Sequence, residues 1–182
     1  VGLSRYHIRR GEFDSALTYA ERATKLSQDV PASTQALAWL QLGTTLVELS
    51  RLTEAEQALD KASQLGARYP NTLALCNFER ARILHARGKF EESLGIYSQV
   101  LSHHRSVGTR FYLAQIYERM GDVLQENGYH ELALQHLQEA VRLAETHGFK
   151  MILANSNYDL AWAFYRIRNY DLSSNYINKA IQ

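Results

Sequence analysis

Histidine-containing stretches are the first places in this sequence to test for metal or acid–base chemistry. The run His130-Glu131-Leu132-Ala133-Leu134 follows the zinc-protease pattern H-E-x-x-H until its last position, where Leu134 stands in place of the second histidine. A zinc ion needs both histidines on one helix face, so this run predicts no metal site. His103 and His104 are adjacent and therefore point to different faces of a helix. A solvated or helix-capping role is favoured for them over metal binding.

Other catalytic arrangements are missing from the sequence. It contains no Gly-rich phosphate loop, no nucleophile elbow and no pair of carboxylates on one face beside a base. The single cysteine, Cys76, is expected to be a small residue of the core. We therefore predict that the chain is not an enzyme and that it binds no metal and no cofactor.

One group of side chains favours binding instead. Tyr158, Trp162 and Tyr165 are spaced i, i+4 and i+7, which places three aromatic rings with polar ends on one helix face. Side chains of this kind are favoured as anchors of protein interfaces. The chemistry that the sequence predicts is therefore recognition of a partner.

Composition limits the partners and the setting. Twenty Lys and Arg residues against nineteen Asp and Glu residues give a formal charge of +1, so the overall field neither attracts nor repels nucleic acid strongly. We expect no direct nucleic-acid binding by this region. No apolar run approaches the roughly 20 residues needed to span a bilayer, so we expect no membrane insertion. A single cysteine favours a reducing, cytoplasmic location.

The elements that position these residues are helices, and they recur in five units at a spacing of about 40 residues. The long runs between glycines are rich in residues that lose little on entering a helix. A small residue in the first helix of each unit recurs at a nearly constant step. Seven residues later comes a turn, where glycine can take a positive φ and end a helix. The small residues are Ser4, Gly43, Ala81, Gly121 and Ala161, and the turn residues are Gly11, Ser50, Gly88, Gly128 and Arg168.

The second helix of each unit follows the same register. Small side chains recur on it seven residues apart, as in Ala55 with Ala62 and Ala133 with Ala140, which places each pair on one helical stripe. Helix breakers separate the units, and each lies at the same distance after the small first-helix residue of its own unit. These breakers are Pro31, Pro70, Gly108 and Gly148.

We predict a single domain of about five such repeats. Because Val1 enters partway through a first helix and the chain stops soon after Ala180, we expect the first and last repeats to be truncated, in a fragment of a longer protein. The open ends also predict self-association through uncapped repeats. The predicted repeats are residues 1–34, 35–72, 73–112, 113–152 and 153–182.

The second unit carries the clearest motif. Trp39-x2-Leu42-Gly43, followed by Ala55 and Ala62, resembles the tetratricopeptide repeat, whose signature is W-x2-L-G-x2-Y, then A-x3-F, then P. The resemblance covers essentially the whole chain. It implies an all-α fold, a right-handed superhelical stack of antiparallel helix pairs called a TPR-like α-solenoid. The structural repeat positions that it indicates are Trp39, Gly43, Ala55, Ala62, Gly88, Gly121, Gly128, Ala133, Ala140 and Ala161.

The spacing of the units exceeds the usual repeat length of about 34 residues and is similar to that of the elongated repeats of bacterial regulators. Examples are the sensor regions of maltose-regulator-like transcription activators and the peptide-pheromone receptors. The resemblance implies a non-enzymatic scaffold that binds a protein segment or peptide, within a bacterial signalling or transcription regulator. The alternative is a sensor domain, in which a small-molecule effector or peptide controls an attached output domain.

The resemblance also indicates where a ligand would bind. First helices line the inner, concave wall of such stacks, and their faces turned away from the second helices form a groove. Two interpretations of its aromatic stripe remain open: it binds a ligand, or it packs against a following repeat. The predicted groove residues are Phe78, Arg82, His85, Arg119, Asp122, Tyr158, Trp162 and Tyr165.

Overall fold

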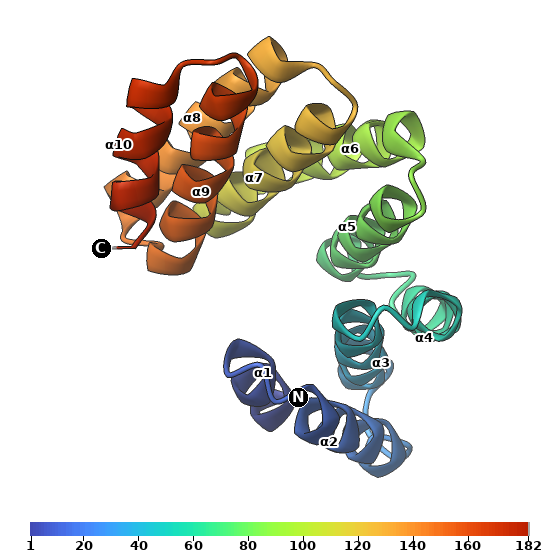
Figure 1. Ribbon diagram of the computed structural model, residues 1–182. Helices are drawn as coiled ribbons and strands as arrows, with labels where there is room; N and C mark the ends of the chain where they lie inside the picture. Colours follow the sequence, from blue (N-terminus) through green and yellow to red (C-terminus); the bar gives the residue numbers. More distant parts are fainter. Residues whose placement is uncertain (182) are drawn as a thin grey trace. The chain divides into compact units, whose positions relative to one another are not determined.

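The computed structural model describes residues 1–181, and over this range it contains ten α-helices and no strand (Figure 1). This confirms the predicted all-α fold. The helices are α1 (Gly2–Arg9), α2 (Phe13–Leu26), α3 (Ala32–Glu48), α4 (Leu52–Leu65), α5 (Pro70–Ala86), α6 (Phe90–Val107), α7 (Arg110–Glu126), α8 (His130–His147), α9 (Lys150–Arg166) and α10 (Tyr170–Ala180).

The chain divides into two compact units, Val1–Arg87 and the residues from Gly88 onward. Unit 1 holds α1 to α5 and unit 2 holds α6 to α10. The continuous single domain and the five repeat boundaries remain predictions.

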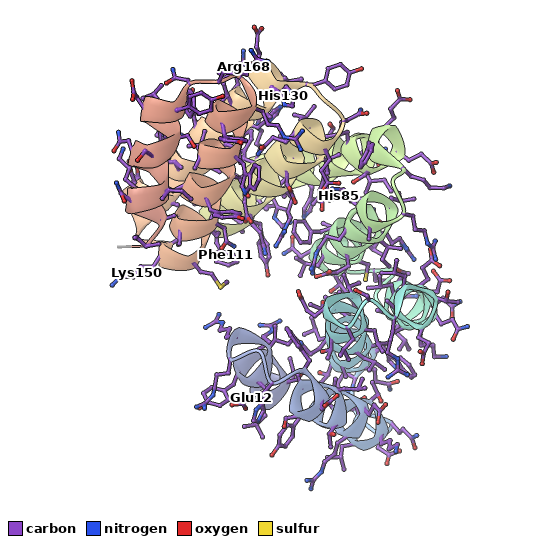
Figure 2. All side chains as sticks on the ribbon, viewed as in Figure 1. Glu12, His85, Phe111, His130, Lys150 and Arg168 are labelled. Carbon is purple, nitrogen blue, oxygen red and sulfur yellow. The ribbon has the colours of Figure 1, made fainter. Side chains whose placement is uncertain are left out.

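Within each unit, every helix packs against the next one and alternate helices also meet. In unit 1 the alternate contacts join α1 to α3 and α3 to α5; in unit 2 they join α7 to α9. Figure 2 shows Phe111 and Lys150 at one end of unit 2 and His130 and Arg168 at the other, so α7 and α9 run in the same direction. Each unit is therefore a two-layer stack, with first helices in one layer and second helices in the other.

The turns inside the helix pairs follow the register of the repeat. All five turn residues named above have a positive φ, including the non-glycine residues Ser50 at 57° and Arg168 at 63°. Backbone bonds close these turns, such as Tyr129 N–H to the Leu124 carbonyl at 2.8 Å. Bonds of this kind, from an N–H five residues further along the chain, satisfy the last carbonyls of a helix. The position in the repeat, more than the residue type, therefore sets the conformation.

Close contact between paired helices requires glycine at two equivalent places. A Cβ atom on Gly43 would lie 2.7 Å from Leu59 Cδ2, and one on Gly121 would lie 2.5 Å from Leu137 Cγ. Both distances are shorter than carbon atoms tolerate, so each unit uses the same backbone-to-leucine contact to join its pair.

The core of unit 1 includes one cluster that spans α2 to α5, and Cys76 is fully buried within it, as predicted. In unit 2, Leu137 of α8 packs with Leu160 and Phe164 of α9. Over residues 1–181 no helix combines the length and the apolar character that a bilayer crossing requires.

Candidate functional site

The predicted groove residues lie on three first helices. Phe78, Arg82 and His85 belong to α5 in unit 1, and the others belong to α7 and α9 in unit 2. His85 lies in the last turn of α5 (Figure 2). The structure thus presents two sets: the first lies on one helix of unit 1, and the second is brought together by two neighbouring helices of unit 2.

The set in unit 1 is organised around Arg82. Its Nη2 donates to Glu48 Oε1 at 2.9 Å and its Nη1 donates to Glu79 Oε2 at 2.9 Å. Thr44 Oγ1 donates to the other oxygen of Glu79 at 3.0 Å. These bonds tie α3 to α5 through a largely buried guanidinium. Phe78 is 4% exposed and so offers a ligand little surface.

Unit 2 carries a carboxylate cluster, formed by Glu118 and Asp122 on α7 and Asp159 on α9. Glu118 is buried and accepts a hydrogen bond from Asn155 Nδ2 at 3.4 Å. Arg119 Nη2 lies 3.9 Å from Glu118 Oε1, too far for a hydrogen bond. The cluster therefore joins α7 to α9 at the place where two first helices meet.

The electrostatics of the carboxylate cluster are unusual. Burial raises the pKa of Asp159 to about 7, and the carboxylates of Asp122 and Glu118 contribute, while Arg119 acts in the opposite direction. Desolvation and like charge both disfavour the ionised carboxylate. Near neutral pH the Asp159 carboxyl group is thus divided between its acid and its anion, and a cation placed beside it would shift it to the anion. No group of three or more potential metal ligands within residues 1–181 is arranged to hold an ion.

The aromatic row, defined as Tyr158, Trp162 and Tyr165, is the other feature of unit 2. Its side chains are 48%, 45% and 52% exposed, respectively. Trp162 and Tyr165 meet edge to face, with ring centroids 5.6 Å apart. A groove of about 320 Å³ runs between α9 and α10 beside this row. We call it the α9–α10 groove; its lining residues are Tyr158, Ala161, Trp162, Tyr165, Ser173 and Ile177.

Ser173 and Ile177, which line the α9–α10 groove, were missing from the predicted groove set, whereas Glu118 and Asp159 lie on the first-helix face predicted to form the groove. Glu118 and Asp159 lie on first helices, but their proximity becomes visible only when α7 and α9 are packed. Ser173 and Ile177 belong to α10, which the prediction left out of the groove. Ser173 and Ile177 follow the regular spacing of the second helices, and this spacing could have identified them in the sequence.

His104 differs from its prediction. It was expected to be solvated or capping, but it is 2% exposed, and its ring stacks on Tyr112 with centroids 4.7 Å apart. Its Nδ1 lies 2.6 Å from Thr109 Oγ1. Burial, aided by His103, lowers the pKa of His104 to about 4. His104 is therefore a neutral core residue at neutral pH.

Comparison with known families decides the identity of the fold. Two tetratricopeptide-repeat family models match the chain, one over residues 1–70 and the other over residues 73–146 and 112–182. The chain belongs to the tetratricopeptide repeat family. Its helix pairs are those of an all-α, TPR-like solenoid, as the motif around Trp39 predicted. A comparison with curated proteins gives no match.

Solved structures of other tetratricopeptide-repeat proteins share this fold. A Rap protein complexed with competence and sporulation factor matches with a TM-score of 0.90 and 16% identity, over 98% of this chain and 51% of the Rap chain. A Rap conjugation gene regulator of the plasmid pLS20, in complex with the Phr* peptide, matches with a TM-score of 0.84 and 17% identity, over 98% and 50%.

A signal transduction ATPase of the STAND class with a tetratricopeptide repeat sensor, from Pyrococcus horikoshii, is also similar. Its TM-score is 0.78 at 21% identity, over 99% of this chain and 28% of that protein. The chain thus spans about half the length, or less, of these three tetratricopeptide-repeat structures. At these identities the likeness establishes the fold.

Proposed function

We propose that the chain is a non-enzymatic scaffold that binds a protein segment or peptide, within a bacterial-type signalling or transcription regulator. The observation that carries this proposal is the aromatic row beside the α9–α10 groove. Three large aromatic side chains left about half exposed on one helix face form an apolar patch, and such patches on soluble proteins mark interaction sites. The phenol and indole groups also add hydrogen-bond donors.

The carboxylate cluster adds chemical selectivity to the same unit. Asp159 shares the α9 helix with the aromatic row, and a lysine or arginine of a bound segment would relieve the repulsion between its carboxylate and those of Asp122 and Glu118. We therefore expect bound segments to combine apolar and basic residues. Two structurally similar Rap proteins were solved in complexes, one of them with the Phr* peptide, which supports a binding role for this fold.

Selection from a phage-displayed peptide library tests the proposal. The wild-type chain is expected to enrich a peptide family, and the Tyr158→Ala, Trp162→Ala double variant is expected to lose that enrichment. Tyr129→Ala is the matched control, because Tyr129 is an exposed aromatic residue of the same unit outside the groove. The proposal fails if no family is enriched, or if both variants enrich the same peptides as the wild type.

A second candidate function is effector sensing. The structure of the STAND protein contains a tetratricopeptide repeat sensor with the same fold, which favours this alternative. A small molecule that raises the melting temperature of the wild-type chain, with the shift lost on Trp162→Ala or Asp159→Asn, would support sensing. Equal shifts in wild type and variants would count against it.

A further inference from the structure

Unit 1 contains a pocket that is separate from the features described above. Its volume is about 370 Å³, its walls are formed by α2 and α4, and its floor is formed by α3 with the partly buried ring of Trp39. Unit 1 also contains the helix before α2 and the helix after α4, so the pocket lies between neighbouring repeats and not at an end of the stack. We call it the Trp39 pocket; its lining residues are Glu21, Trp39, Leu42, Leu46, Arg51, Glu54, Gln57, Ala58 and Lys61.

The equivalent place in unit 2 is filled by side chains of the chain itself. Tyr117 of α7 is the equivalent of Trp39, and Arg105 of α6 lies over its ring, with Cζ 5.7 Å from the ring centroid. Arg105 Nη2 also donates a hydrogen bond to the Tyr117 hydroxyl group. The ring of His136, on α8, lies 5.7 Å from the Tyr117 ring, centroid to centroid. A guanidinium and an imidazole therefore close this place in unit 2.

Unit 1 lacks both of these filling groups. Ala58 of α4 stands at the position of His136. Gln28 stands at the position of Arg105, but it lies beyond the end of α2. The Trp39 pocket is thus the space that an imidazole and a guanidinium occupy two repeats later.

The third repeat shows which group pairs with the preceding wall. Arg80 of α5 lies one turn after the equivalent of Trp39, and its Nη2 donates to Asp60 Oδ1 on α4 at 2.8 Å. Asp60 is the equivalent of Glu21 on α2, whereas Leu42 stands at the position of Arg80. The Trp39 pocket therefore keeps the carboxylate of this ion pair and lacks its guanidinium.

The charges beside the Trp39 ring favour a cation next to Glu21. Arg51 donates two hydrogen bonds to Glu54, at 2.7 and 2.5 Å. The pKa of Arg51 is raised mainly by this contact, and Glu21 adds only the effect of its charge. Lys61 is exposed on α4, the opposite wall. The wall formed by α2 thus offers a carboxylate beside an indole, the aromatic ring that attracts cations most strongly.

We infer that the Trp39 pocket binds a guanidinium group, such as the side chain of an arginine. The planar cation lies over the Trp39 ring, as Arg105 lies over Tyr117, and donates to Glu21, as the equivalent pair does in the third repeat. A guanidinium stacks on aromatic faces and carries a rigid fork of N–H donors, so it suits a ring beside a carboxylate. The inference does not rest on the proposed function, because this pocket belongs to unit 1 and the aromatic row belongs to unit 2.

NMR spectroscopy of the indole N–H group tests the inference. Trp39 and Trp162 are the two tryptophans of the chain, so in the Trp162→Phe variant the remaining indole signal reports on this pocket. N-acetyl-arginine methylamide is expected to shift that signal in a saturable manner. The matching citrulline derivative has nearly the same shape without the charge, and it should bind about tenfold more weakly or worse.

Two charge changes with opposite expected effects sharpen the test. Glu21→Gln should weaken binding about fivefold because it removes the carboxylate, whereas Lys61→Gln should strengthen binding about twofold because it removes a like charge. Asp14→Asn is the matched control, since Asp14 is an exposed carboxylate of the same helix outside the pocket, and it should leave the affinity unchanged. Ala58→His copies His136 and should weaken binding by filling the pocket.

Three results would overturn the inference. The first is a citrulline derivative that binds as tightly as the arginine derivative, and the second is a Glu21→Gln variant with wild-type affinity. The third is no shift of the Trp39 signal at tens of millimolar ligand, or a shift only with N-acetyl-aspartate methylamide that is lost on Lys61→Gln, since the pocket would then take an anion.

A comparison with free L-arginine identifies the source of the guanidinium. Equal or tighter binding of the blocked derivative supports an arginine side chain within a protein segment, because both ends of that derivative are amides. Tighter binding of free L-arginine supports a small molecule whose carboxylate reaches Lys61. Either order supports a guanidinium site, provided that Glu21→Gln weakens the binding.

Discussion

The contact between neighbouring first helices uses the same two repeat positions in both units, but the side chains differ. In unit 1 these positions are Thr44 of α3 and Glu79 of α5, joined by a hydrogen bond of 3.0 Å. In unit 2 they are Asp122 of α7 and Asp159 of α9, two carboxylates that repel each other. At these two positions unit 1 therefore has a hydrogen bond where unit 2 has like charges, while α7 and α9 are joined beside them by hydrogen bonds from Gln125 Nε2 to the Asp159 carbonyl at 3.1 Å and from Asn155 Nδ2 to Glu118.

The next position along the helix extends the contrast. In α5 it is Arg82, which bonds both Glu48 and Glu79. In α9 the equivalent residue is Trp162, so the guanidinium is replaced by a half-exposed aromatic ring. Unit 1 thus has a hydrogen-bonded guanidinium on this face, whereas unit 2 has an exposed aromatic ring, which belongs to the site that we propose for partner binding. The same backbone carries both arrangements because each depends on two or three side chains only.

The largest effect should come from a feature that the units share. Gly121→Leu places a side chain where a Cβ alone would lie 2.5 Å from Leu137 Cγ, and Gly43→Leu repeats this against Leu59. We expect each variant to lose about 3 kcal/mol of unfolding free energy through overpacking. Chemical denaturation followed by circular dichroism measures the loss. An unchanged midpoint in either variant would mean that the two pairs are not joined in the same way.

Arg82→Ala should have the next largest effect on stability. It should show that the contact between α3 and α5 in unit 1 depends on the hydrogen bonds of Arg82. It leaves the Glu48 and Glu79 carboxylates without the guanidinium that α5 supplies, so we expect a loss of about 2 kcal/mol. Arg80→Ala is the control, because Arg80 pairs with the exposed Asp60 and such surface pairs contribute little. Equal losses in the two variants, measured by chemical denaturation, would contradict the contrast between the units.

Asp159→Asn should change how stability depends on pH. The pKa of Asp159 is about 7 in the folded chain, and an ordinary aspartate has a pKa of about 4. Its proton therefore binds the folded state more tightly, and the resulting stabilisation is complete below about pH 4 and is lost as the pH rises through 7. Asparagine avoids that loss. We expect the variant to gain about 2 kcal/mol over wild type at about pH 8, and little at about pH 4.5.

Because the contribution of His104 to stability also depends on pH, the Asp159→Asn variant must be compared with the wild type at each pH. The pKa of His104 is lowered to about 4, so its contribution is complete above about pH 6.5 and is lost as the pH falls toward 4. The stability that His104 contributes therefore rises with pH, whereas the stability that Asp159 contributes falls with pH.

Asp122→Thr, which copies Thr44 of unit 1, should lower the pKa of Asp159, as a carboxyl NMR titration would show. If the gain in unfolding free energy of Asp159→Asn does not vary with pH, the raised pKa of Asp159 is not its cause.

The period of the sequence predicts positions along a helix but not contacts between helices. It located every inter-helix turn, including those at Ser50 and Arg168, because a repeat fixes where each helix must end. It could not pair Asp122 with Asp159, or Asn155 with Glu118, because those contacts depend on how α9 is rotated against α7. His104 was assigned wrongly for a similar reason: its cover is Tyr112 of the next helix, which its sequence neighbours do not reveal.

The smallest effect concerns a turn in each unit. Ser50 and Arg168 hold a positive φ where the equivalent turns have glycine, and an L side chain is strained in that region. We expect Ser50→Gly and Arg168→Gly each to gain about 0.5–1 kcal/mol, since relief of the strain exceeds the entropy that glycine loses on folding. Melting temperatures measure both gains, and Ser98→Gly in the middle of α6 is the control that should lose stability. Arg168 joins α9 to α10. If Arg168→Gly gains stability and leaves the affinity for the library-selected peptides unchanged, binding depends on the faces of the two helices. A changed affinity would make the turn part of the binding surface.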